Sequence, residues 1–295
     1  MQNPFLAPTR IRAALRSLEL RPTRGMGQNF LTDAAALAAI VAAGAPAAPD
    51  TVVEVGPGLG VLTWELVQRA GRVVAVELDR RLAEWLRDEF AAITRLAIIE
   101  GDILDLPPEV LLGGSGQIPP YKVIANLPYA ITSPVLRHFL ESRYPPEVMV
   151  VLVQREVAER IAAAPGDMSV LAHAIQIYAE PEIVGRVAAE SFIPAPAVES
   201  AILRLRRRVV PVVDPAEVAG LMRVIKAGFL HARKQLGNGL PAGLAAMGQR
   251  IERPSVLAAL ATAGVGASRR AETLALSEWQ AVAAALAAAD TALPQ

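Results

Sequence analysis

The sequence predicts an α/β protein whose mainly parallel sheet is followed by a small all-helical domain. Between residues 51 and 205, short apolar runs alternate with helical stretches, and this alternation is typical of parallel strands joined by helices that cover both faces of a sheet. After residue 215 only helical stretches follow, which favours a separate helical domain. The chain has 295 residues and is 53% hydrophobic, so it can bury one large core and one smaller core.

Two helices are expected before the sheet begins. Thr9 is a suitable N-cap for the first, which carries apolar residues on one face and arginines on another. Asp33 can cap the second, an alanine-rich helix that ends near Gly44. A glycine-containing loop connects them.

The sheet is expected to contain seven strands. They are placed at Thr51–Val55, Arg72–Glu77, Leu96–Glu100, Lys122–Ala125, Val148–Val153, Ile183–Val187 and Ala201–Leu205. The helices expected between them are Leu62–Arg69, Arg81–Phe90, Pro134–Glu141, Glu156–Ala164 and Val170–Tyr178. In such sheets the ligand binds beyond the carboxyl ends of the strands.

A basic segment with two prolines, Arg206–Pro215, is interpreted as a linker between domains. We therefore divide the chain into a domain at residues 1–208 and a helical domain at 209–295. The helices expected after the linker are Pro215–Phe229, Leu240–Met247, Pro254–Ala263 and Ser277–Ala289.

Composition excludes several classes of protein and site. The chain has no cysteine and three histidines, so disulfides, thiolate chemistry and a zinc site are not expected, and we predict no metal. No apolar run reaches the roughly 20 residues that cross a bilayer, and Met1–Arg12 lacks the order of a secretory signal. A soluble, cytoplasmic protein is expected.

The formal net charge of zero hides an uneven distribution along the chain. Residues 1–30 contain five arginines and one glutamate, and residues 200–275 contain twelve lysines or arginines and four acids. The central part is correspondingly acidic. This pattern allows a polyanion to bind through the two basic flanks, although exposed helix faces would explain the same charges.

A glycine turn and two acids at successive strand ends form a candidate cofactor site. The turn Gly56-Pro57-Gly58-Leu59-Gly60 follows the first strand and lets a ligand approach the backbone. Its spacing is not that of a dinucleotide fingerprint. Glu77 ends the second strand, where a ribose diol needs a carboxylate, and Asp102 follows the third, where it can accept a hydrogen bond from an adenine amino group. Together they fit S-adenosylmethionine better than NAD, although each element alone is compatible with ordinary loop chemistry.

The segment Asn126-Leu127-Pro128-Tyr129 follows the fourth strand and forms a candidate acceptor site. Hydrogen bonds from an adenine amino group to the Asn126 side-chain oxygen and the Leu127 carbonyl would aim the nitrogen lone pair at a methyl donor. Tyr129 would stack on the base, and Phe192 could close over its opposite face. The alternatives are a core tyrosine at 129 and loop packing at 192.

The chain resembles the KsgA family of small-subunit rRNA adenine dimethyltransferases over nearly its whole length. The segments that carry the resemblance are GQNFL at 27–31, VVEVGPGLGVLT at 52–63, VELD at 76–79, GDILD at 101–105, NLPY at 126–129, VQREVAERI at 153–161, SFIPAPAVESAILRL at 191–205 and GFLHARKQLGNGL at 228–240.

The resemblance implies a Rossmann-like, class I S-adenosylmethionine-dependent methyltransferase with a helical C-terminal domain. Its substrate would be two adjacent adenosines in the 3′-terminal hairpin of 16S rRNA, each dimethylated on the exocyclic nitrogen within an assembling small subunit. The residues implied to contact S-adenosylmethionine are Asn29, Leu31, Gly56, Glu77, Asp102 and Asn126, and the glycine turn adds Gly58.

The implied RNA contacts lie in two basic groups. Candidates are Arg206, Arg207 and Arg208 after the last strand, and Arg233 and Lys234 in the helical domain. For each one alone an exposed structural residue is the better explanation, whereas as a group they suit an rRNA helix. The sequence departs from the family pattern at Ala130, where asparagine usually follows NLPY, and at Ala232, which replaces one arginine of a basic run.

Two other functions remain compatible with the sequence. One is an Erm-type enzyme that methylates large-subunit 23S rRNA, against which the C-terminal match and the NLPY segment argue. The other is a non-catalytic assembly or transcription factor that kept the fold. Because a ribosomal particle is a large, asymmetric partner, we expect a monomer.

Overall fold

The computed structural model describes residues 3–20, 29–113 and 118–291. The described chain packs into two compact units, one formed by residues 1–158 and 179–207 and the other by 159–178 and 208–295. The change of unit at 207/208 lies beside the expected boundary. Residues 159–178, which we expected in the first domain, group instead with the C-terminal helices.

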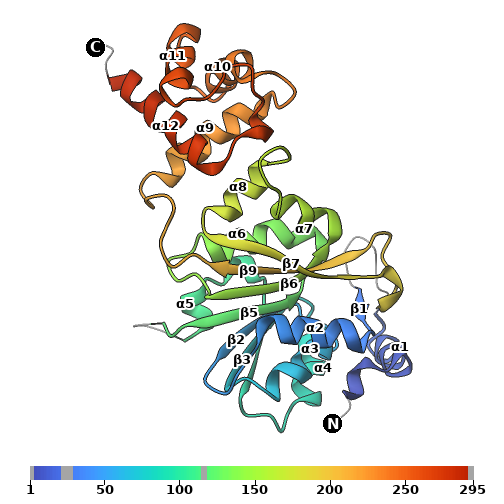
Figure 1. The fold of residues 1–295 in the computed structure, drawn as a ribbon. Coiled ribbons are helices and arrows are strands. Elements are labelled where there is room, and N and C mark those ends of the chain that lie inside the picture. The colour runs from blue at the N-terminus through green and yellow to red at the C-terminus, as the bar shows by residue number, and fades with distance from the viewer. Residues whose placement is uncertain (1–2, 21–28, 114–117, 292–295) are drawn as a thin grey trace. The chain divides into compact units, whose positions relative to one another are not determined.

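The first unit is built on a seven-stranded sheet with the order β4-β3-β2-β5-β6-β9-β7 (Figure 1). The first five strands in this order are parallel, and β9 runs antiparallel to both β6 and β7. The expected mainly parallel sheet is therefore confirmed. The strands are β2 (Thr51–Val55), β3 (Arg72–Glu77), β4 (Leu96–Glu100), β5 (Tyr121–Asn126), β6 (Val148–Gln154), β7 (Ala179–Val187) and β9 (Ser200–Arg207).

Helices of this unit connect and cover the strands. They are α1 (Pro8–Ser17), α2 (Ala34–Gly44), α3 (Val61–Val67), α4 (Arg80–Glu89), α5 (Pro108–Leu111) and α6 (Thr132–Leu140), with short 3₁₀ turns η1 (Pro4–Leu6), η3 (Ile103–Asp105), η4 (Tyr129–Ile131) and η5 (Ala189–Ser191). Asp33 caps α2 as predicted, because its carboxylate accepts hydrogen bonds from two backbone amides of the first turn. Thr9 does not cap α1, since that helix already begins at Pro8, a favoured first residue.

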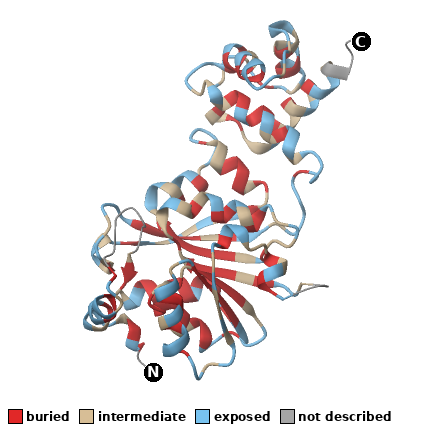
Figure 2. Ribbon diagram, turned by 180° about the vertical axis from the view of Figure 1, so that it is seen from behind, coloured by how far each residue is buried: buried red, intermediate tan, exposed pale blue. Residues whose placement is uncertain are grey.

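The main core lies between α2, α3, α4 and one face of the sheet. Ile40 of α2, Leu66 of α3 and Leu86 of α4 are fully buried together with strand residues such as Ile124 and Val150. Figure 2 shows that the central strands are buried along most of their length. The backbone at the carboxyl ends of these strands is thereby held in place by burial on the sheet's face.

A two-stranded sheet that we did not expect joins β1 (Phe30–Leu31) to β8 (Phe192–Ile193). The contact is strengthened next to it, where the Thr32 amide and hydroxyl both donate to the Ser191 carbonyl. The Ser191 hydroxyl also donates to Asp33 at 2.8 Å. Two segments that are distant in the sequence are therefore joined by backbone and side-chain hydrogen bonds in the first unit.

The second unit contains α8 (Val170–Gln176), α9 (Val218–Leu230), α10 (Leu236–Ala246), α11 (Arg253–Thr262), η6 (Ala271–Thr273) and α12 (Leu276–Thr291). The helix α7 (Arg155–Ile161) spans the change of unit at 158/159. Residues 159–178 join this unit because the His173 ring of α8 packs against the rings of Phe229 and Trp279, with centroids 5.8 and 6.3 Å away.

The helix α10 begins four residues before the expected Leu240 and contains Pro241. Proline has no amide hydrogen, so the carbonyl four residues earlier, that of Gly237, loses its helical partner. The Arg253 side chain donates to that carbonyl at 3.2 Å and replaces the missing bond. A contact from another helix thus allows a helix that the local sequence disfavours.

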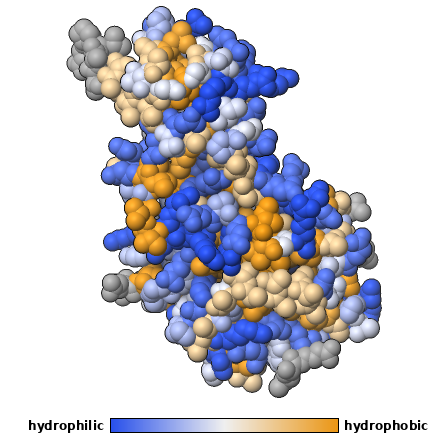
Figure 3. All heavy atoms as spheres, viewed as in Figure 1, coloured by the Kyte–Doolittle hydropathy of each residue, from blue (hydrophilic) through white to orange (hydrophobic). Residues whose placement is uncertain are grey.

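Large apolar side chains are mostly inside. On the face seen in Figure 3, hydrophilic side chains cover much of the surface and apolar ones form separate patches. The most exposed large apolar residues that the structure describes are Val209 and Val210, which lie in the segment that we interpreted as a linker.

Close helix packing in the second unit depends on glycine. A Cβ atom at Gly243 of α10 would lie 2.0 Å from the Ala227 carbonyl oxygen of α9. We expect Gly243→Ala to lower the free energy of unfolding by about 1–3 kcal/mol, since the helices must separate. Gly220→Ala is the matched control: its new Cβ meets nothing within 4 Å, and alanine should raise helix stability slightly. Denaturant unfolding measures both, and equal effects would contradict this explanation.

Burial of His173 should make stability depend on pH. Neither ring nitrogen has a hydrogen-bond partner among the residues that the structure describes, and burial lowers the pKa of His173 to about 4 from its ordinary value of 6.5. Between these values the unfolded chain binds a proton that the folded chain does not, so the unfolding free energy falls as pH falls. The slope is at most about 1.4 kcal/mol per pH unit. Urea unfolding from pH 4 to 7 should show this slope weakened in His173→Phe.

Candidate active site

The carboxyl ends of β2, β3, β4 and β5 open into one pocket of about 460 Å³. The order of the sheet reverses between β2 and β5, the position at which open α/β sheets bind ligands. The predicted residues that line the pocket are Asn29, Gly56, Gly58, Glu77, Asp102 and Asn126. The sheet therefore brings together residues that lie far apart in the sequence.

The glycine turn after β2 has a backbone that only glycine adopts easily. Gly56, Gly58 and Gly60 all have positive φ values, of 65°, 58° and 81°. Side chains would also clash there, because a Cβ at Gly60 would lie 2.7 Å from Phe90 and one at Gly58 would lie 3.1 Å from Phe30. The turn thus presents bare backbone at the start of α3, where a ligand can approach closely.

Glu77 connects the glycine turn to the end of β3. One of its carboxylate oxygens accepts from the Gly58 amide at 3.0 Å, and the other accepts from the Asp79 amide at 3.0 Å. The residue is 6% exposed, and burial raises the pKa of Glu77, while the two amides oppose this shift. Each oxygen keeps a second lone pair, so the carboxylate can still accept from two adjacent hydroxyl groups of a ligand.

Asp102 lies after β4 and is exposed at the edge of the pocket. Its Oδ1 atom accepts from the Leu104 amide at 2.9 Å and so caps the short turn η3. Through this contact Asp102 acts as a turn former, which is the ordinary loop chemistry that the sequence left open as an alternative. It fixes the orientation of the carboxylate without preventing the second oxygen from accepting a further hydrogen bond.

Asn126 is the last residue of β5, and its side-chain amide nitrogen is already used in a hydrogen bond. Its Nδ2 atom donates to the Asn29 carbonyl at 3.1 Å, which leaves Oδ1 as the group that can accept from a substrate amino group. The next residue is also held, because the Leu127 amide donates to the Leu152 carbonyl of β6 at 3.2 Å. The segment is thus anchored to a neighbouring strand and to the residue before β1.

Tyr129, Phe192 and Leu31 do not line this pocket. The Tyr129 ring is half-buried, and its hydroxyl is 2.7 Å from the Ser200 hydroxyl. Phe192 and Leu31 are 3% and 4% exposed and lie in the main core. The position of Phe192 corresponds to the loop-packing alternative, and its stacking role stays a prediction that requires the ring to leave the core.

The predicted RNA-contacting residues differ in their surroundings. Arg206, Arg207, Arg233 and Lys234 are exposed. Arg208 is half-buried, and its guanidinium donates to the Gln176 carbonyl at 2.9 Å. The Arg208 guanidinium is therefore already engaged in a structural contact.

Sequence reasoning missed the apolar part of the pocket and one buried acid. Leu78, Ile103 and Ile131 line the pocket, and Leu78 is 70% exposed. Leu78 could have been predicted to line the pocket, because it is an apolar residue between the two acids Glu77 and Asp79. Glu54 is 1% exposed and bonds to the Thr63 hydroxyl at 2.7 Å. Burial raises the pKa of Glu54 to about 8, and the Thr63 hydroxyl opposes this shift.

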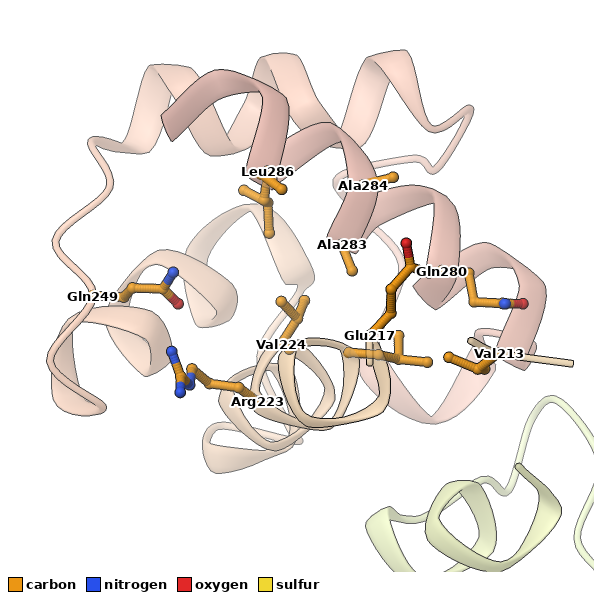
Figure 4. A pocket seen from close by; sticks show the side chains of 12 residues that line it. Val213, Glu217, Arg223, Val224, Gln249, Gln280, Ala283, Ala284 and Leu286 are labelled. Carbon is orange, nitrogen blue, oxygen red and sulfur yellow. The ribbon is translucent and has the colours of Figure 1, made fainter. Parts of the chain in front are cut away.

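A second pocket, of about 250 Å³, lies within the helical unit (Figure 4). Apolar residues such as Val224 and Leu286 face it from α9 and α12, and Arg223 and Gln249 lie at one side. None of the predicted cofactor or acceptor residues that the structure describes is among its lining residues. We therefore assign the candidate active site to the first pocket.

The first pocket fits S-adenosylmethionine by the chemistry of its groups. The buried Glu77 carboxylate suits a ribose diol, Asp102 suits an adenine amino group, and the apolar Leu78 suits the face of a base. Over residues 3–20, 29–113 and 118–291, no cluster of acids or histidines could hold a metal ion. Over the same residues, no helix combines the length and apolarity needed to cross a membrane.

The known proteins to which this chain is similar are ribosomal RNA methyltransferases. A family model described as ribosomal RNA adenine dimethylase matches residues 21–280. The chain is 43% identical over 277 residues to ribosomal RNA small subunit methyltransferase A of Dehalococcoides mccartyi, covering 93% of this chain and 92% of that protein. It is 40% identical over 281 residues to the protein of the same name from Geobacter sulfurreducens, covering 95% and 100%.

Two solved structures share the fold. The 23S rRNA methyltransferase ErmE is 29% identical with a TM-score of 0.67, covering 88% of this chain and 100% of that chain. A dimethyladenosine transferase from Plasmodium falciparum is 23% identical with a TM-score of 0.69, covering 86% and 95%. The second likeness shows the fold alone.

The role of Glu77 can be tested by a change that keeps its shape. In Glu77→Gln, the new amide group must face either the Gly58 or the Asp79 amide, and one hydrogen bond is lost. We expect the Kd for S-adenosylmethionine to rise at least about 10-fold. Calorimetric titration measures the Kd, and Glu84→Gln, in an exposed ion pair of α4, is the control. An unchanged Kd in Glu77→Gln would contradict the assigned role.

Proposed function

Because the chain belongs to the family of ribosomal RNA adenine dimethylases, we propose that it dimethylates two adjacent adenosines in the 3′-terminal hairpin of 16S rRNA. The observation that carries the proposal is the position of Asn126 at the pocket formed by the glycine turn, Glu77 and Asp102. An amide acceptor for an amino group thus lies beside a site suited to a methyl-donating nucleoside.

In this proposal S-adenosylmethionine supplies a methyl group on a positively charged sulfur. The chain's own residues hold it: the Glu77 carboxylate accepts from the ribose hydroxyls, and Asp102 accepts from the adenine amino group. The glycine turn lets the rest of the molecule approach the backbone at the start of α3. Leu78, which is largely exposed, would become covered by the bound adenine.

The acceptor adenine needs positioning more than it needs a base. Its exocyclic nitrogen is a weak nucleophile because its lone pair is delocalised into the ring. The Asn126 Oδ1 atom and the Leu127 carbonyl would accept hydrogen bonds from the amino group and favour a nitrogen whose lone pair faces the methyl. The Asn29 carbonyl supports this by fixing the Asn126 amide with its oxygen available.

The Tyr129 ring would stack on the acceptor base. Burial raises the pKa of Tyr129, and the hydrogen bond to Ser200 only partly offsets this. The hydroxyl therefore stays protonated at neutral pH. This argues for a role of the ring itself, and Phe192 would cover the other face of the base only after leaving the core.

Exposed basic residues would hold the RNA. Arg206 and Arg207 in the first unit and Arg233 and Lys234 in the second can contact phosphates without losing the hydrogen bonds described above. Such contacts release counterions, so binding should weaken as salt rises. Arg208 is the weakest candidate of the five, because it already donates to the Gln176 carbonyl.

Removal of the Asn126 amide separates methyl transfer from cofactor binding. We expect Asn126→Ala to lower the transfer rate by roughly 100-fold or more, in the range found when one preorganised polar group is removed. The Kd for S-adenosylmethionine should change only a few-fold. Single-turnover transfer to undermethylated small subunits measures the rate, with Asn238→Ala in the helical unit as control. Transfer at the wild-type rate would exclude the proposed role.

The substrate is tested by giving the enzyme a choice. Labelled S-adenosylmethionine is incubated with undermethylated small subunits and, separately, with large subunits, and the modified base is mapped. We expect label on two adjacent adenosines near the 3′ end of 16S rRNA. Label on 23S rRNA would identify an Erm-type enzyme, the alternative favoured by the likeness to ErmE. No label on either particle would favour a non-catalytic factor.

A further inference from the structure

The Tyr129 hydroxyl forms a hydrogen bond that the proposed chemistry does not use. Its Oη atom lies 2.7 Å from the Ser200 Oγ atom. Ser200 is 0% exposed and is the first residue of β9. In the sheet it pairs with Gln154 of β6 on one side and Val187 of β7 on the other. The tyrosine is therefore attached to one of the best-held backbone positions of the first unit.

We propose that Ser200 is a positioning residue for methyl transfer, which holds the Tyr129 ring at the angle required to stack on the acceptor adenine. The inference rests on the proposed function and deepens it. Ser200 itself touches neither the cofactor nor the reacting nitrogen in this proposal. It acts only through the tyrosine.

The rest of the acceptor segment explains why the ring needs this contact. Asn126 is held through the Asn29 carbonyl, and Leu127 through the Leu152 carbonyl of β6. The first bond holds the Asn126 side chain and the second holds the backbone at Leu127, but neither restricts the side-chain torsions of the half-buried Tyr129 ring. A hydrogen bond at the far end of the ring removes that freedom before the base arrives. The entropy cost of ordering the Tyr129 ring is then part of folding and not of substrate binding.

The same contact argues against a chemical role for the hydroxyl. Ser200 is inside the sheet, so a hydroxyl bonded to it is directed away from solvent. Burial also raises the pKa of Tyr129, so the hydroxyl is not a ready proton acceptor. What Tyr129 can offer a substrate is the ring face.

A double-mutant cycle tests the proposal. Tyr129→Phe, Ser200→Ala and the double variant are compared with the wild type by kcat and KM on undermethylated small subunits. We expect each single variant to lower kcat/KM by about 3- to 10-fold, the range of one neutral hydrogen bond. The double variant should be no worse than the worse single variant, because all three lack the same bond. The Kd for S-adenosylmethionine should not change.

Three further variants serve as reference points for the loss of activity. Tyr129→Ala removes the ring and should lose far more activity than Tyr129→Phe. Ser200→Thr keeps a hydroxyl and should recover activity relative to Ser200→Ala. Tyr144→Phe removes a tyrosine hydroxyl from the segment before β6 and should match the wild type. If the buried Ser200→Ala variant does not fold, the Tyr129→Phe result still tests the bond, because that variant leaves the core intact.

Several results would overturn the proposal. Additive losses in the double variant would mean that the two hydroxyls act separately. A loss in Tyr129→Phe much larger than in Ser200→Ala would mean that the tyrosine hydroxyl takes part in chemistry. Wild-type activity in both single variants would mean that the bond is irrelevant to transfer. If the wild type itself does not methylate small subunits, the proposed function fails, and this inference fails with it.

Discussion

The candidate site depends above all on the Glu77 carboxylate and the two backbone amides that it accepts from. One amide belongs to the glycine turn after β2 and the other to the start of α4. A buried carboxylate that is held in this way fixes the spacing between two neighbouring strand ends. The pocket therefore has its shape in the absence of a ligand, since a single side chain sets the position of both the turn and its own oxygens.

The acceptor segment is likewise held by hydrogen bonds to other elements of the first unit. Asn126 and Leu127 are bonded to residues before β1 and within β6, and Tyr129 is bonded to β9. Each bond reaches a different element: the residue before β1, the strand β6 and the strand β9. A substrate base would therefore meet groups whose directions are set by the fold, which is what catalysis by positioning requires.

Much of the first unit could be predicted from the sequence because its patterns are local. The strands Thr51–Val55, Arg72–Glu77 and Leu96–Glu100 were predicted with their observed bounds, since each is a short apolar run that ends at an acid or a turn. The acids at strand ends could be placed in one pocket because parallel strands end at one edge of a sheet. The two-stranded sheet β1–β8 could not be predicted, because strands of two residues have no period.

Other features depend on partners that are distant in the sequence. The start of α10 was missed because glycines and Pro241 disfavour a helix, and the compensating bond comes from Arg253. Glu54 was missed because a carboxylate within an apolar run gives no sign of its burial against Thr63. The core position of Phe192 follows from pairing with β1. Residues 159–178 likewise group with helices that follow them by many residues.

Because residues 159–178 belong to the helical unit, this unit is not one continuous segment of the chain. Its chain is interrupted by β7 and β9, so the part that begins at residue 208 lacks a segment that it packs against. A chimera that exchanged only the C-terminal residues between related enzymes would join α9 and α12 of one parent to His173 of the other. The rings of Phe229 and Trp279 thus pack against a residue that lies more than fifty positions upstream, so an exchange of one side of this contact has to preserve its fit to the other.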